Sequence, residues 1–250
     1  MQFFQRRPKQ AKWPDHFTLD LDGAPVEIAV KVHARARSYR LSLRDAGRAV
    51  LTVPVHGRAD EAEAFVRRQR HWLQSRLKRA PGPRPFAEGA VVPLRGADHR
   101  IAATGRLRGT VTLVEAADMP VLFVPGAPEH LGRRLTDWLK TEAKRDLDAR
   151  VAVHAATLAV SPTALSLRNQ SSRWGSCSAK GRLNFNWRLV MAPPFVLDYV
   201  AAHEVAHMRE MNHSPAFWAE VARTLPDFER GRAWLKSHGR ELMVYGLDAG

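Results

Sequence analysis

Two histidines and a glutamate lie within five residues of one another, in the order His203-Glu204-Val205-Ala206-His207. Apolar residues precede them at helical spacing, so we expect a buried helix here. A helix advances about 100° per residue, so both imidazoles project from one face and can bind one zinc ion. Glu204 stands beside the first histidine, where it can take a proton from water that the zinc activates. This pattern predicts a hydrolytic zinc site with Glu204 as general base.

A catalytic zinc site needs a third protein ligand and an open position for water. His213 follows His207 by six residues, the spacing of the metzincin pattern H-E-x-x-H-x-x-G-x-x-H. Glu210 stands where that pattern has glycine, so we expect Asn212 to supply the left-handed turn that ends the helix. Glu220 is the alternative third ligand, because gluzincin-like enzymes place a carboxylate on the next helix. The other eight histidines, His154 among them, have no such spacing, and we expect no metal-binding role for them.

The elements that must position this site fall into two parts. Up to residue 126 the pattern is mainly β, with strands near 17–21, 26–30, 39–43, 50–55, 91, 101, 111 and 121–124. One basic helix, from about Asp60 to Arg79, interrupts these strands. Beyond Pro125-Gly126-Ala127-Pro128 we expect helices at 131–154, 193–211 and 228–244, another after Ser214-Pro215, and a strand at 164–167. The prediction is an α+β protein with a mainly β domain at 1–126 and an α+β domain at 127–250.

Composition narrows the class of protein. The chain of 250 residues is 45% hydrophobic and 26% charged, typical of a globular protein. A single cysteine and the absence of an apolar run near 20 residues favour a cytoplasmic protein with no membrane span. The net charge is +14, and the first 90 residues hold 18 basic and 9 acidic residues. This charge makes nucleic acid a candidate partner, although a solvated basic surface explains it equally well.

With these residues in hand, the chain resembles the YgjP-like metal-dependent hydrolases of the WLM and SprT-like zincin group. The motifs that carry the resemblance are Arg173-Trp174-Gly175-Ser176-Cys177-Ser178, Leu183-Asn184, His203-Glu204-x-x-His207, Asn212-His213-Ser214-Pro215-x-Phe217-Trp218 and Pro226-Asp227. The resemblance implies a zincin-like fold for the C-terminal domain. It also implies His203, His207 and His213 as ligands of one Zn²⁺, with Glu204 as general base.

Three functions are compatible with these residues. The first is a zinc metallopeptidase, which is how the family is usually described. The second is a metal-dependent nucleoside triphosphate pyrophosphohydrolase on the same site, because a nucleotide-hydrolysing activity has also been attached to the group. The third is a nucleic-acid-associated protease, with the basic N-terminal part as the binding module. Arg173 is a candidate substrate-binding residue in any of them, since a guanidinium can neutralise an oxyanion or hold a phosphate. A structural salt bridge is the alternative role for Arg173.

Overall fold

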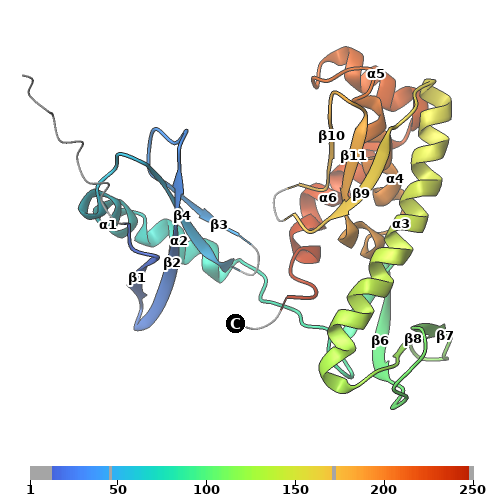
Figure 1. The fold of residues 1–250 in the computed structure, drawn as a ribbon, viewed down its shortest axis with the longest axis horizontal. Helices are drawn as coiled ribbons and strands as arrows, with labels where there is room; N and C mark the ends of the chain where they lie inside the picture. The colour runs from blue at the N-terminus through green and yellow to red at the C-terminus, as the bar shows by residue number, and fades with distance from the viewer. Residues whose placement is uncertain (1–12, 45–46, 171–172, 248–250) are drawn as a thin grey trace, which may run out of the picture. The chain divides into compact units, whose positions relative to one another are not determined.

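The structure is a computed structural model that describes residues 13–44, 47–170 and 173–247. Contacts between residues divide the chain into two compact units, Met1–Gly82 and Pro83–Gly250. We call them the N-terminal unit and the C-terminal unit. Strands predominate in the first half of the chain and helices in the second (Figure 1), which confirms the predicted α+β class.

The N-terminal unit is one sheet with two helices packed against it. Its strands are β1 (His16–Leu21), β2 (Ala24–His33), β3 (Arg40–Leu43) and β4 (Ala49–Pro54), in the order β1-β2-β4-β3. Asp22 and Gly23 join β1 to β2 with φ of 56° and 85°, as expected for a tight hairpin turn in which both residues have positive φ. The buried face of the sheet packs on Val66 and Leu73.

The predicted basic helix is two helices in the structure, α1 (Ala59–Arg68) and α2 (Arg70–Lys78). Gln69 separates them, and its backbone N–H is shared between the carbonyls of Phe65 and Val66 at 3.2 and 3.0 Å. The spacing of apolar residues could not indicate this break, because Val66 before it and Leu73 after it both lie in the same buried cluster.

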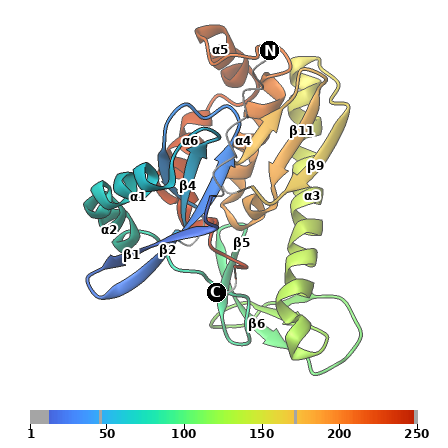
Figure 2. The ribbon, with the colours of Figure 1, turned by 60° about the vertical axis from the view of Figure 1, so that its left-hand side comes forward.

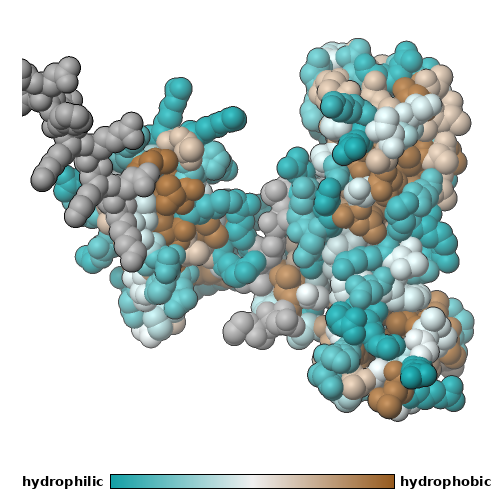
Figure 3. Space-filling model, viewed as in Figure 1, coloured by the Kyte–Doolittle hydropathy of each residue, from teal (hydrophilic) through white to brown (hydrophobic). Residues whose placement is uncertain are grey.

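The first part of the C-terminal unit is a four-stranded sheet packed on a long helix. The strands are β5 (Val91–Leu94), β6 (Ala97–Ala103), β7 (Thr112–Val114) and β8 (Val121–Val124), in the order β5-β6-β8-β7. The 3-10 helix η2 (Pro128–His130) leads into α3 (Leu131–Leu158), which runs along this unit from β6 and β8 to α5 (Figure 1). Surface hydrophobic patches are visible at the end that carries β6–β8 (Figure 3), where Leu107, Leu113 and Val114 are exposed.

The two units divide at residues 82–83, whereas the sequence analysis expected the junction at 126–127. The difference arises because Ile101 and Leu122 of the four-stranded sheet share one buried cluster with Leu135 and Leu139 of α3. The chain turns at Gly126, whose φ is +121°, but the hydrophobic core continues across the turn. Strands β5–β8 thus form part of the unit that carries His203, His207 and His213.

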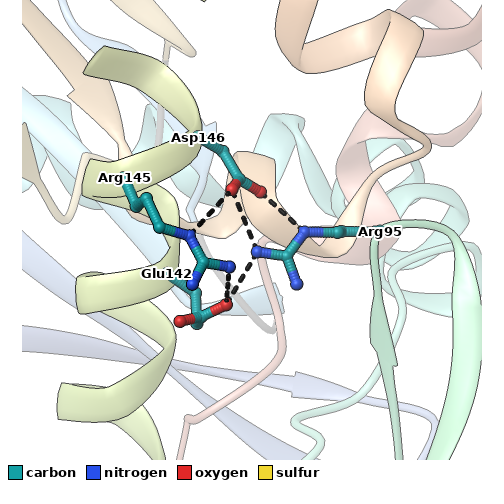
Figure 4. A network of polar contacts seen from close by, with 4 residues as sticks. All are labelled: Arg95, Glu142, Arg145 and Asp146. Carbon is teal, nitrogen blue, oxygen red and sulfur yellow. Dashed lines mark hydrogen bonds and ion pairs between the residues drawn. The ribbon is translucent and has the colours of Figure 1, made fainter. Parts of the chain in front are cut away.

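Arg95, at the turn between β5 and β6, connects this sheet to α3 (Figure 4). Its guanidinium donates two hydrogen bonds to Asp146, of 2.8 and 3.0 Å, and one of 2.7 Å to Glu142. Arg145 donates to the same Glu142 carboxylate at 2.5 Å. The backbone N–H of Arg95 also donates to the carbonyl of Val190, 2.7 Å away. The turn is therefore held against α3 and against the segment that leads into the helix with the histidine pair.

The second part of the C-terminal unit consists of a small sheet followed by helices (Figure 2). The elements are β9 (Ala164–Arg168), β10 (Gly175–Cys177), β11 (Arg182–Asn186), η3 (Trp187–Met191), α4 (Pro194–Ala206), α5 (Pro215–Thr224) and α6 (Phe228–Leu242). The strand order is β10-β11-β9, so β10 is an edge strand. Helix α4 packs against α3, α6 and β10. Among the described residues, no helix has the length and apolar character needed to cross a membrane.

Candidate metal centre

Helix α4 carries the partly buried His203 and the buried Glu204. Pro194 begins the helix, where a missing N–H costs nothing, and most of the following side chains are buried apolar residues. The helix ends at Ala206, earlier than the predicted Met211, and His207 is its C-terminal cap. His207 keeps a helical φ and ψ of −61° and −18°. The one-turn spacing between His203 and His207 is therefore preserved, although the helix ends one residue before His207.

The chain reverses direction after His207 without a left-handed asparagine. Asn212 is not among the described residues with positive φ, so the expectation of a left-handed turn there was wrong. Instead, the Asn212 side-chain carbonyl accepts a 2.9 Å hydrogen bond from the backbone N–H of Ser214. Ser214 then caps α5, its hydroxyl accepting from the N–H of Phe217, as predicted. The side-chain hydrogen bond of Asn212 replaces the backbone conformation that we expected to turn the chain toward His213.

The structure brings His203, His207 and His213 together. One nitrogen from each ring lies within 4.8 Å of the others, and the facing Nε2 atoms of His203 and His213 are 3.1 Å apart. The buried ring of Phe217 lies 4.4 to 4.9 Å from all three imidazoles and stacks on that of His207. This apolar ring supports the three imidazoles and limits their freedom to separate.

The donor set suits a divalent cation such as zinc. His207 Nδ1 donates to the carbonyl of Glu210 at 3.0 Å, which leaves Nε2 as the ring nitrogen with a free lone pair. The pKa of His203 is lowered to about 3, mainly by burial and in smaller part by the nearby His207 and His213. Three neutral imidazoles whose lone pairs converge repel one another unless a cation lies between them. The chemistry of the ligands and their spacing therefore fit a tetrahedral zinc ion with an open fourth position.

Glu204 directly follows His203 on α4 and is only 5% exposed. Burial raises the pKa of its carboxyl to about 8, and the positive charge of Arg173 opposes that rise. The carboxylate packs against Gly175 of β10, where a Cβ atom would lie 2.6 Å from Glu204 Cγ. Gly175 therefore leaves the space that Glu204 occupies. Gly175 was noted in the sequence only as part of a motif, and the space that it leaves for Glu204 was not predicted.

Glu220 does not belong to the cluster of potential metal ligands that the described residues form. Its carboxylate accepts a 2.7 Å hydrogen bond from Arg223 and lies 3.8 Å from Arg209. Arg173 is exposed, its charge acts on Glu204, and it forms no ion pair with another described residue. This position is compatible with the substrate-binding role expected for Arg173, and it leaves the structural salt bridge without a described partner.

His154, for which no role was expected, forms a buried link between three helices. It is fully buried in α3, its Nε2 lies 2.7 Å from Asp198 of α4, and its Nδ1 lies 2.8 Å from Thr224 of α5. Arg150 forms two further hydrogen bonds with Asp198, of 2.5 and 2.8 Å. These contacts connect the helix of His203 to the helix that follows His213. The contacts are tertiary, and no local motif around residue 154 could have indicated them.

Comparison with known proteins identifies the family of this chain. The sequence model of the YgjP-like family, described as a metallopeptidase domain, matches residues 37–238. No curated protein matches the chain. The crystal structure of the metallopeptidase zymogen abylysin from Pyrococcus abyssi is similar at 19% sequence identity and a TM-score of 0.33. That similarity covers 37% of this chain and 95% of abylysin. The family match confirms the resemblance seen in the motifs: the chain belongs to the YgjP-like family and is a metal-dependent hydrolase of the peptidase type.

Proposed function

We propose that the protein is a zinc-dependent peptidase in which His203, His207 and His213 bind one Zn²⁺ and Glu204 is the general base. The observation that carries the proposal is the convergence of three imidazoles beside a buried carboxylate. When bound, zinc supplies a Lewis acid that lowers the pKa of water and polarises a carbonyl oxygen.

The residues around the three histidines provide the remaining parts of a peptidase. Glu204 accepts a proton from the attacking water and returns it to the leaving amine, and its burial strengthens it as a proton acceptor. Strand β10 is an edge strand that contacts α4, so an extended polypeptide can pair with it close to Glu204. Arg173 directly precedes this strand and can hold a developing negative charge. These features favour a polypeptide substrate.

The decisive variant for the general base is Glu204→Gln. It keeps the shape of the side chain and removes its ability to accept a proton. We expect zinc content equal to wild type and a loss of peptide cleavage by a factor of about a thousand or more. Metal analysis and cleavage of fluorescent casein by the zinc-loaded proteins measure both quantities. Cleavage at the wild-type rate would refute the assignment of Glu204.

The third ligand is tested by comparing His213→Ala with Glu220→Ala. We expect His213→Ala to weaken zinc binding by about a hundredfold or more, because it removes a ligand directly. Glu220→Ala should leave the zinc dissociation constant near that of wild type, since its carboxylate pairs with two arginines. The opposite order of effects would assign the third position to Glu220.

The same proteins decide between peptide and nucleotide substrates. We expect no release of pyrophosphate from nucleoside triphosphates by zinc-loaded wild type under conditions in which casein is cleaved. Pyrophosphate release that Glu204→Gln abolishes, without casein cleavage, would replace the peptidase with a nucleotide hydrolase on the same residues. Nucleic acid as a partner, and with it a nucleic-acid-associated protease, is tested by adding DNA to the casein assay.

A further inference from the structure

A second arginine, on α6, lies beside the three histidines. Helix α6 crosses α4 at Gly231, where a Cβ atom would lie 3.0 Å from both the Phe195 carbonyl and the Tyr199 ring. Tyr199 is one turn before His203, and the two ring centroids are 5.8 Å apart. The close crossing therefore places the next residue of α6, Arg232, next to the site.

Aromatic contacts locate the Arg232 side chain more closely. Its guanidinium carbon lies 4.6 Å from the centroid of the Trp218 ring. The same ring is 5.9 Å from the centroid of His203 and 5.9 Å from that of His213. One indole thus separates the positive charge from two of the proposed zinc ligands.

Arg232 keeps hydrogen-bonding capacity for a ligand. Its side chain is 50% exposed, and its one ion pair among the described residues is a 2.8 Å contact with Glu229, which is 62% exposed. Such surface pairs contribute little free energy and exchange readily. A guanidinium has five N–H donors, so others remain to hold a carboxylate. Arg173 is also exposed and stands two residues before Gly175, which packs against Glu204, so the site has a second cation near its carboxylate.

We propose that Arg232, with Arg173, binds an acidic side chain of the substrate, so that the enzyme prefers polypeptides with Asp or Glu near the bond that is cleaved. This inference rests on the proposed peptidase function and specifies its substrate class. The geometry favours a carboxylate because a guanidinium over an indole is held in place and can form two parallel hydrogen bonds with a planar anion.

The test uses peptide pairs that differ only in Glu versus Gln. A peptide library digested by zinc-loaded wild type supplies a cleaved sequence, and each position flanking the cleaved bond is then exchanged. We expect at least one position at which Glu raises kcat/KM about tenfold over Gln. Arg232→Gln should bring this ratio close to one, and raised salt should lower it in wild type.

Arg230→Gln is the matched control, because Arg230 lies on the same helix with its guanidinium 3.9 Å from the ring centroid of Phe195. It changes the net charge equally, and the preference for Glu should survive it. A ratio that Arg232→Gln leaves unchanged, or that Arg230→Gln lowers as strongly, would overturn the proposal.

A binding measurement separates failure of this inference from failure of the proposed function. Fluorescence anisotropy of a labelled Glu-rich peptide and its Gln counterpart is recorded with zinc-loaded Glu204→Gln, with and without Arg232→Gln. We expect tighter binding of the Glu peptide, by about tenfold, and its loss in the double variant. Binding of this kind without any cleavage by wild type would support the acidic subsite and refute the peptidase. Cleavage without a preference for Glu would refute the subsite alone.

Discussion

Replacing Gly175 with alanine tests whether β10 holds Glu204 in its catalytic position. The added Cβ would lie 2.6 Å from Glu204 Cγ and would also overlap the carboxyl group. Ordinary contacts of a Cβ atom begin at 3.4 Å, so the glutamate side chain must withdraw by about 0.8 Å. Gly175 has an ordinary negative φ, so the effect is steric and involves no strain of the alanine backbone.

A displacement of this size is large for a general base. Misplacing a reacting group by about 1 Å costs about a hundredfold in rate, equivalent to about 2.7 kcal/mol in the activation barrier. We expect Gly175→Ala to lower kcat/KM for casein by about a hundredfold. Zinc affinity should change little, because the three atoms nearest to the added Cβ all belong to Glu204. Overpacking should lower the free energy of unfolding by about 1 to 3 kcal/mol.

Gly132→Ala is the matched control, since a Cβ there would meet its nearest neighbour, the Phe86 carbonyl, at 3.4 Å inside α3. It should leave cleavage unchanged and raise stability slightly, because alanine favours a helix. The assays are casein cleavage, zinc titration and urea unfolding of wild type and both variants. Wild-type activity in Gly175→Ala would refute the argument. Loss of activity in proportion to loss of zinc would show that β10 positions the ligands, and that Glu204 is not the group displaced.

Three further predictions concern the contacts that hold the site in place. His154→Ala should lower the free energy of unfolding in urea by about 3 kcal/mol, because it creates a cavity and removes a hydrogen-bond partner from both Asp198 and Thr224. Burial acts to raise the pKa of Asp198, but hydrogen bonds from His154 and Arg150 outweigh it, and the pKa lies below the ordinary value. This carboxylate thus stabilises the fold above about pH 4 and loses its contribution as the pH falls further, so Asp198→Asn should flatten the dependence of stability on pH in acid. Arg95→Gln should cost about 1 to 2 kcal/mol in the same urea assay, since it removes a bidentate, partly buried ion pair with α3.

Local sequence patterns were sufficient to predict where the helices near the histidines begin. Ser214 and Pro215 begin α5, and Pro194 begins α4, because capping and proline preferences depend only on adjacent residues. The spacing of His203 and His207 required only the geometry of one helical turn. His213 was harder to assign as a ligand, because its distance from His203 and His207 depends on how the chain reverses direction after His207. That reversal uses a side-chain hydrogen bond from Asn212 where we had expected a backbone conformation.

The boundary between the units could not be predicted from composition. Proline and glycine at 125–128 indicate a turn, and the structure has a turn there. A turn becomes a domain boundary only if few contacts cross it, and that depends on which distant residues share a core. Ile101 and Leu122 pack on α3 beyond the turn, so the strands belong with the helices that follow.

Dependence on contacts between distant residues also explains which residues of the site could not be predicted from the sequence. Gly175, His154 and Arg232 are far apart in the chain, and each acts through contacts with distant elements. Gly175 contacts a carboxylate on α4, His154 contacts side chains of α4 and α5, and Arg232 contacts an indole on α5. Metal ligands are found from sequence because zinc requires particular side chains at particular spacings. Residues that make room, connect helices or select substrates are not restricted in this way, since many side chains at many positions could do the same work. Their identification therefore depends on the packing of α4 against β10, α3 and α6, which brings residues of these elements close to Glu204 and the histidines of the site.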